Sequence, residues 1–104
     1  MNNLFTIVGR VKENTPIKTN RKGEKFIKAT ISTPRPFKNE DGEYKDDYIN
    51  VILRGKVATM FVDYLHVGDL IGIKGRMEST ERGTTILVGD KISFLSSTPP
   101  KEVE

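Results

Sequence analysis

The spacing of apolar residues changes twice within residues 48–77, which read YINVILRGKVATMFVDYLHVGDLIGIKGRM. Apolar and polar residues alternate in 48–54 and again in 70–78, and this alternation, rich in β-branched residues, predicts strands. Residues 56–65 instead carry apolar side chains at i, i+3, i+4, i+7 and i+8, which predicts an amphipathic helix of about three turns. Gly68 suits the left-handed backbone that often ends a helix, so we expect the helix to stop close to it.

Further strands are expected on both sides of this stretch. The same alternation predicts strands at residues 4–11 and 26–33, and a last strand made of 84–88 and 91–95 that bends at Gly89. The intervening segments contain the turn sequences NRKG, NEDG and RG. Asp-Gly is a strong hairpin signal because both residues tolerate positive φ.

Five strands with one α-helix between strands 3 and 4 are the element order of an OB-fold, an all-β Greek-key barrel. An SH3-like barrel also has about five strands but lacks a helix at that point. Glycines are expected at barrel corners, where strands bend or approach closely: Gly9, Gly72, Gly75 and Gly89. A chain of 104 residues makes one domain, which we expect over residues 1–95, with a flexible polar tail over 96–104.

The composition excludes several kinds of site. The chain has no cysteine, so it has no disulfide framework, no thiolate nucleophile and no Cys-based zinc site. Its single histidine, His66, excludes a multi-His metal site within one chain. No apolar run is long enough for a membrane span and the N-terminus does not read as a signal peptide, which favours the cytoplasm.

Catalytic features are weak. The acidic run over residues 40–47 is more typical of a solvated hairpin tip than of a Mg²⁺ site, and no serine or threonine has a convincing base partner. We therefore expect no enzyme, no metal and no cofactor.

Charge and aromatic residues point to a nucleic acid. The net charge is +3, and residues 1–56 hold 12 of the 17 basic residues, so a polyanion would meet this half of the chain. Aromatic rings interleaved with cations on one sheet face suit single strands, whose bases stack on rings while Lys and Arg follow the phosphates. The candidate binding residues are Phe37, Tyr48, Arg10, Lys28, Arg35, Lys38, Asn50, Arg54, Lys56, Lys74 and Arg76.

Over about residues 2–95 the chain resembles the bacterial-type single-stranded DNA-binding proteins. The resemblance is carried by NLFTIVGRV (3–11), YINVILRGK (48–56) and IKGRM (73–77), in this order. It implies an OB-fold that forms a homo-oligomer, usually a tetramer, and wraps single-stranded DNA in replication, recombination and repair. Phe37 and Tyr48 fall where the family commonly has stacking aromatics, whereas Arg54 stands where many members carry Phe.

The family usually continues into a linker and an acidic tip that recruits repair proteins, and this sequence ends in KEVE. We therefore expect a short version, trimmed or of phage or plasmid type, without recruitment through a tail.

The sequence predicts a sequence-tolerant binder of single-stranded DNA. The alternative is an OB-fold accessory of a replication or primosome complex that binds proteins, which Arg54 and Arg82 favour because they replace aromatics. A third, an OB-fold nuclease using the acidic hairpin, would require Mg²⁺. The sequence leaves open the choice between dimer and tetramer and between DNA and RNA.

Overall fold

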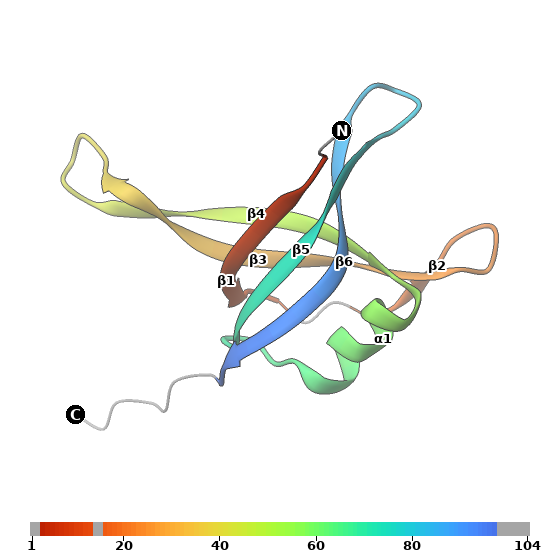
Figure 1. Ribbon diagram of the computed structural model, residues 1–104. Helices are drawn as coiled ribbons and strands as arrows, with labels where there is room; N and C mark the ends of the chain where they lie inside the picture. The colour runs from red at the N-terminus through yellow and green to blue at the C-terminus, as the bar shows by residue number, and fades with distance from the viewer. Residues whose placement is uncertain (1–2, 14–15, 98–104) are drawn as a thin grey trace.

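A computed structural model describes residues 3–13 and 16–97 of the chain. It contains one helix and six strands, of which β2 has only two residues (Figure 1). The elements are β1 (Phe5–Val11), β2 (Lys18–Thr19), β3 (Lys25–Lys38), β4 (Tyr44–Arg54), α1 (Gly55–Tyr64), β5 (Leu70–Ser79) and β6 (Thr85–Ser96). The tail predicted at 96–104 lies outside the described residues except for Ser96, which ends β6, and Ser97.

The strands close into a barrel in the order β1-β5-β6-β4-β3, and pairing between β1 and β3 completes the ring. All of these pairings are antiparallel except the one between β4 and β6. The helix lies between the third and fourth strands of the barrel, β4 and β5, because the short β2 only adds to the edge of β3. The predicted OB-fold is therefore confirmed.

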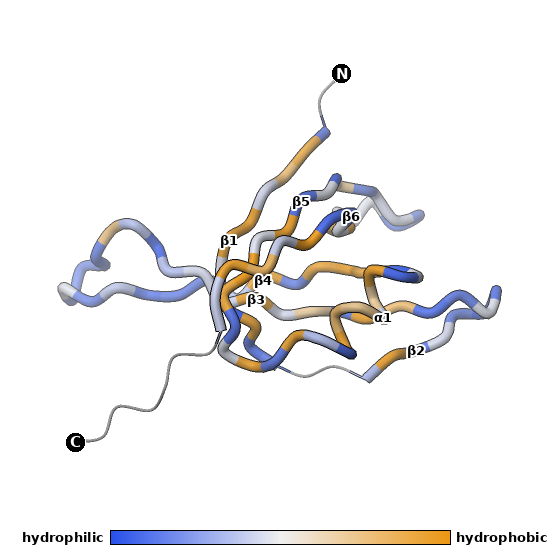
Figure 2. Tube along the Cα trace, turned by 60° about the horizontal axis from the view of Figure 1, so that its bottom comes forward, coloured by the Kyte–Doolittle hydropathy of each residue, from blue (hydrophilic) through white to orange (hydrophobic). Residues whose placement is uncertain are grey.

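The core follows the predicted alternation along the strands. Every second residue in the barrel part of β3 (Ile27, Ala29 and Ile31) is fully buried, and so are Val51 and Leu53 of β4. Ile71 and Ile73 of β5 meet them from the other side, and α1 covers the core with Ala58 and Phe61. Hydrophobic residues accordingly gather in the barrel strands and in α1, while the hairpin tips are mostly hydrophilic (Figure 2).

Two details of the helix prediction are wrong. Tyr64 lies on the predicted apolar face but is 72% exposed, because α1 turns only Ala58 and Phe61 fully inward. The helix is capped by Leu65, whose backbone is extended, and not by Gly68. Gly68 does have positive φ (95°), but in the turn that follows, where its N–H donates to the Val11 carbonyl at 2.8 Å. This turn ties the chain after α1 to β1.

Close approach explains three of the four corner glycines. A Cβ at Gly9 would overlap the Ser32 carbonyl oxygen. A Cβ at Gly75 would overlap the Val88 carbonyl oxygen, and a Cβ at Gly89 would lie 2.6 Å from the Leu53 side chain. Gly72 has room for a side chain, so close approach does not explain that position. Next to Gly89 the pairing with β5 shifts by one residue at Asp90, which confirms the expected bend as a β-bulge.

Beyond Gly75, β5 is paired with β6 but not with β1 among the described residues. Met77, predicted to face the core, is consequently exposed.

The segment between the second and third predicted strands forms a two-stranded arm. β3 continues to Lys38 and β4 begins at Tyr44, so both strands extend well beyond the barrel (Figure 1). The predicted turn at the tip is confirmed: Asn39 Oδ1 accepts the Glu43 N–H at 2.9 Å, and Gly42 has φ of 79°. The two prolines of the segment, Pro34 and Pro36, lie beside and within a bulge of β3, a place where a strand tolerates proline.

Candidate nucleic-acid interface

The outer face of the barrel carries a row of polar and aromatic residues across three strands. Arg10 of β1 is paired with Ser32 of β3, and Ser32 with Tyr48 of β4. Tyr48 remains 58% exposed, although it lies among apolar neighbours in the sequence. Arg10 donates one guanidinium hydrogen bond to the Gly68 carbonyl at 2.9 Å, which holds its side chain against the barrel.

Three of the predicted residues line one groove on this face. Lys28, Tyr48 and Asn50 border a depression of about 460 Å³ between β3, β4 and the start of β6. Thr30 donates to the Asn50 amide oxygen at 2.9 Å, which leaves the amide nitrogen as a donor for a ligand. The groove therefore combines a ring, an amide and a cation.

Two tyrosines of β4 each lie under a lysine ammonium. Lys12 Nζ lies 5.2 Å from the centre of the Tyr48 ring, and Lys38 Nζ lies 5.6 Å from that of Tyr44. Tyr44 is 62% exposed. No carboxylate lies within ion-pair distance of either lysine among residues 3–13 and 16–97. We call these residues the tyrosine row: Lys12, Lys38, Tyr44 and Tyr48.

The outer part of the arm holds the other predicted aromatic residue. Phe37 lies in the bulged segment of β3 and is 79% exposed, so it belongs to no core. Its neighbour Arg35 forms an ion pair with Asp47 at 2.9 Å, and this hydrogen-bonded carboxylate raises the pKa of Arg35 above its ordinary value. Phe37 is thus available to a ligand, while Arg35 is already engaged.

The two arginines predicted on β4 and β5 are joined by acidic residues. Glu78 contacts Arg54 at 3.4 Å and Arg76 at 2.9 Å, and Arg76 also reaches Asp90 at 2.6 Å. The pKa of Arg76 is raised, mainly by the hydrogen bond to Asp90 and to a smaller extent by the contacts with Glu78. Asp90 is the bulged residue of β6, where a bulge redirects a side chain. We call these residues the arginine cluster: Arg54, Arg76, Glu78 and Asp90.

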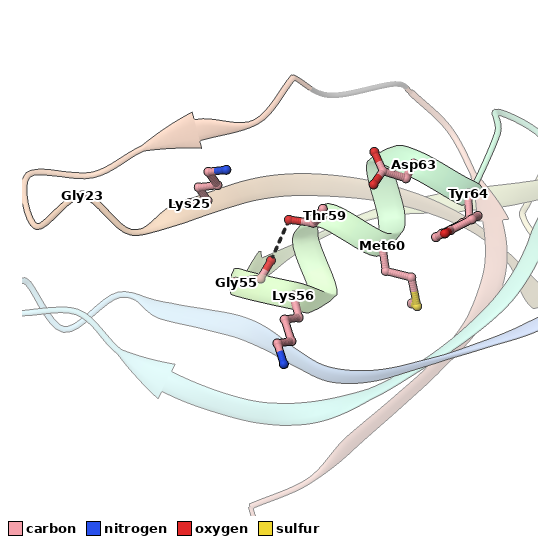
Figure 3. A pocket seen from close by; sticks show the side chains of 8 residues that line it. All are labelled: Gly23, Lys25, Gly55, Lys56, Thr59, Met60, Asp63 and Tyr64. Atoms are coloured by element: carbon pink, nitrogen blue, oxygen red, sulfur yellow. Dashed lines mark hydrogen bonds between the residues drawn. The ribbon is translucent and has the colours of Figure 1, made fainter.

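The two remaining predicted lysines lie elsewhere. Lys56 projects from the first turn of α1, where with Lys25 and Tyr64 it lines a groove of about 570 Å³ beside the β2–β3 hairpin (Figure 3). Lys74 lies on β5 between Thr6 of β1 and Lys91 of β6, two strands away from β4. Neither lysine shares the groove that contains Tyr48.

The structure therefore brings together only part of the predicted set. Tyr48, Asn50 and Lys28 share a groove, Arg10 adjoins them, and Lys38 and Phe37 lie along the arm. Sequence reasoning did not include Tyr44 or Lys12 in its set. Tyr44 lies at i−4 from Tyr48 with the same strand parity, which was the available signal.

The described residues contain no group of His, Cys, Asp and Glu that could hold a metal ion. None of the helices described is long and apolar enough to cross a membrane.

Comparisons with known proteins agree with this architecture. Residues 1–91 match the single-strand binding protein family. The chain is 29% identical over 107 residues to single-stranded DNA-binding protein B of Bacillus subtilis, with 95% of each chain covered. It is 32% identical over 103 residues to single-stranded DNA-binding protein 1 of Staphylococcus aureus, covering 91% of this chain but 66% of that relative.

Among solved structures, the mitochondrial single-stranded DNA binding protein of S. cerevisiae has the same fold. The TM-score is 0.74 at 20% identity, over 93% of this chain and 98% of that chain. Because the family match spans most of the sequence and the barrel is shared, the chain belongs to the single-strand binding protein family.

Proposed function

We propose that this protein binds single-stranded DNA without sequence preference and thereby protects it in replication, recombination and repair. The observation that carries the proposal is Tyr48, an exposed ring on the outer face of the barrel with the Lys12 ammonium above it. The family is one of binding proteins and not of enzymes, and its relatives are named for single-stranded DNA binding.

Base stacking supplies the selectivity for single strands. Every unpaired base has a flat π-face that can lie on a tyrosine or phenylalanine ring, whereas a duplex hides these faces between base pairs. Stacking contributes about 1–3 kcal/mol per base whatever the base, so Phe37 and Tyr48 would bind without reading sequence. Lys28, Lys38 and Arg10 would follow the phosphates, with Asn50 as a hydrogen-bond donor.

The other predicted cations contribute less in this proposal. Arg35, Arg54 and Arg76 already have carboxylate partners and would have to exchange them for phosphates. Lys56 and Lys74 lie away from Tyr44 and Tyr48 and would contact DNA only where a longer strand wraps around the barrel. We also propose a homo-oligomer, a dimer or tetramer, in which wrapping of this kind joins several barrels; light scattering measures its mass.

The decisive experiment is a titration of fluorescent oligo-dT against a duplex of equal length. We expect the single strand to bind much more tightly, with a site of roughly 4–16 nucleotides per barrel. The logarithm of the affinity should fall with the logarithm of the salt concentration, by about 0.7 for each phosphate neutralised. Equal affinity for both forms of DNA would overturn the proposal.

A second candidate function, a protein-binding accessory of a replication or primosome complex, is favoured by a separate groove. Met60, Tyr64, Leu65, Ile92 and Phe94 line an apolar depression of about 420 Å³ between α1 and β6. Weak oligonucleotide binding together with capture of a helicase or primase would support this candidate over the first.

A further inference from the structure

We infer that a bound single strand leaves the barrel along the β3–β4 arm, and that Tyr44 with Lys38 forms a second stacking position beyond Tyr48 with Lys12. The inference rests on the proposed function and deepens it, because it gives the strand a direction and adds two binding residues. Neither Tyr44 nor Lys12 belongs to the set of residues predicted from the sequence.

The two tyrosines present their rings on the same side of β4. Side chains four residues apart on a strand point to the same face, and the rise of about 3.3 Å per residue separates them by about 13 Å. Cross-strand pairing agrees, since Tyr48 lies opposite Ser32 and Tyr44 opposite Lys38. At the rise of about 3.4 Å per nucleotide of a stacked strand, this distance corresponds to about four nucleotides.

Each ring is paired with a cation in the same way. The ammonium groups of Lys12 and Lys38 lie 5.2 and 5.6 Å from the ring centres, which is within the range of a cation–π interaction. Such a contact is weak at an exposed site, and lysine has a long flexible side chain. A base arriving on the ring can therefore displace the ammonium toward the neighbouring phosphate, so that one tyrosine–lysine pair binds one nucleotide.

Asp46 divides the row into two positions. It lies on β4 between Tyr44 and Tyr48, on the same face by alternation, and it lines a groove with Arg10 and Ser32. A phosphate placed against this carboxylate is repelled. The strand would thus contact the two rings and bend away from the sheet between them.

The arm offers better access than the opposite direction along β4. Beyond Asn50 this face of the strand presents Ile52 and then Arg54, whose guanidinium contacts Glu78. The acidic residues of the arginine cluster occupy the places that phosphates would take. Among residues 3–13 and 16–97 no carboxylate pairs with Lys12 or Lys38, so a phosphate can bind them without displacing one. This difference directs the strand toward the arm.

Tyrosine fluorescence tests the inference directly, because the chain has three tyrosines and no tryptophan. The experiment titrates the full chain and the variants Tyr44→Phe, Tyr48→Phe and Tyr64→Phe with oligo-dT. Phenylalanine preserves a ring for stacking while removing the tyrosine emission. The measured quantity is the loss of tyrosine emission on addition of oligo-dT. We expect this loss to be smaller in the first two variants than in the unmodified chain. It should be unchanged in the third, since Tyr64 lies on α1.

Affinity provides the second measurement. Tyr44→Ala should weaken binding of a long oligo-dT by about fivefold or more, the lower end of one lost stacking contact. For an oligo-dT that is about four nucleotides shorter, the same variant should change the affinity by less than about twofold. The matched control is Lys45→Ala, which removes a charge from the same strand on the opposite face and should have an effect below about twofold in both cases.

The outcomes separate this inference from the proposed function. If Tyr48→Phe reduces the quenching but Tyr44→Phe does not, single-stranded binding stands and the path along the arm is wrong. If the intact protein shows no quenching and no affinity for oligo-dT, the proposed function itself fails.

Discussion

The tyrosine row and the arginine cluster lie on the same outer surface, but their cations have different neighbours: aromatic rings in the first and carboxylates in the second. In the tyrosine row each ammonium lies over a ring, 5.2 Å away at Tyr48 and 5.6 Å at Tyr44. In the arginine cluster, Glu78 bridges Arg54 and Arg76, while Asp90 binds Arg76 again. A cation beside a ring keeps its charge available to an anion, whereas a cation beside two carboxylates is already neutralised locally.

This difference shows that a count of basic residues overestimates how many cations are available to a polyanion. Four arginines and lysines of the predicted set lie on β3 and β4, yet Arg35 and Arg54 among them contact acidic side chains. Exposed ion pairs contribute little to stability, since solvent screens them and ordering the side chains costs entropy. Their larger effect here is on binding, because a phosphate must displace a carboxylate before it meets the arginine.

The largest expected effect comes from removing a ring of the proposed platform. Tyr48→Ala should weaken binding of oligo-dT by about 5- to 150-fold, since one stacked base is lost. Phe37→Ala should fall within the same range. Arg54→Ala is the comparison from the arginine cluster and should change the affinity by less than about twofold. If both ring variants bind like the unmodified protein in a fluorescence titration, the stacking surface lies elsewhere.

The next variant gives the arginine cluster an aromatic ring, as in the tyrosine row. Arg54→Phe places a ring on the outer face of β4, two residues beyond Ile52 on the same side of the strand. We expect oligo-dT to bind about fivefold more tightly, the lower end of one added stacking contact, with a larger site size. Arg54→Leu is the matched control, because it breaks the same ion pair without adding an aromatic ring; an equal gain in that variant would show that stacking is not the cause.

A smaller gain is expected from Glu78→Gln, which leaves the shape unchanged but removes the charge that bridges two arginines. Both guanidiniums then become available to phosphates, and binding should tighten by about two- to fivefold, the scale of exposed ion pairs. The salt dependence should steepen by about 0.7 for each new phosphate contact. Glu81→Gln removes the same charge from the β5–β6 turn and should have little effect. An unchanged salt slope would mean that the strand does not reach the arginine cluster.

The smallest expected effect is that of Lys12→Gln. The variant leaves the Tyr48 ring for stacking but removes one phosphate contact, so the salt slope should decrease by about 0.7 and the affinity by about twofold. Salt titrations compare the slope of this variant with that of Lys91→Gln, which removes a lysine of β6 that is paired with Lys74 of β5. A larger loss than that of Tyr48→Ala would indicate that charge dominates over stacking.

Much of the fold was predictable because its signals are local. Alternation in β3, β4 and β5 selected the buried faces that the structure shows, and the glycine-bearing turns appear where expected. The hairpin that ends at Asn39 to Gly42 was predicted, but the extension of β3 and β4 into an arm was not, since a strand that leaves the barrel has no apolar face to bury and therefore no periodicity. The exposure of Tyr64 and Met77 was missed for a related reason: periodicity identifies a face of a helix or strand, but not what covers it.

The candidate site was predictable only as a list of residue types. The placement of aromatics and cations on outward strand positions follows from the two-residue period of a strand, and that period identified Tyr48 and Asn50. Whether a carboxylate already contacts a cation depends on side chains far away in the sequence. Glu78 is 24 residues from Arg54, and Asp90 is 14 residues from Arg76. Such pairs form through the register between strands and through one bulge in β6, which no local pattern specifies. For this protein, backbone periodicity and turn chemistry thus specify a barrel with a helix, whereas the packing of strands against one another separates Lys12 and Lys38, which lie over rings, from arginines already bound to carboxylates.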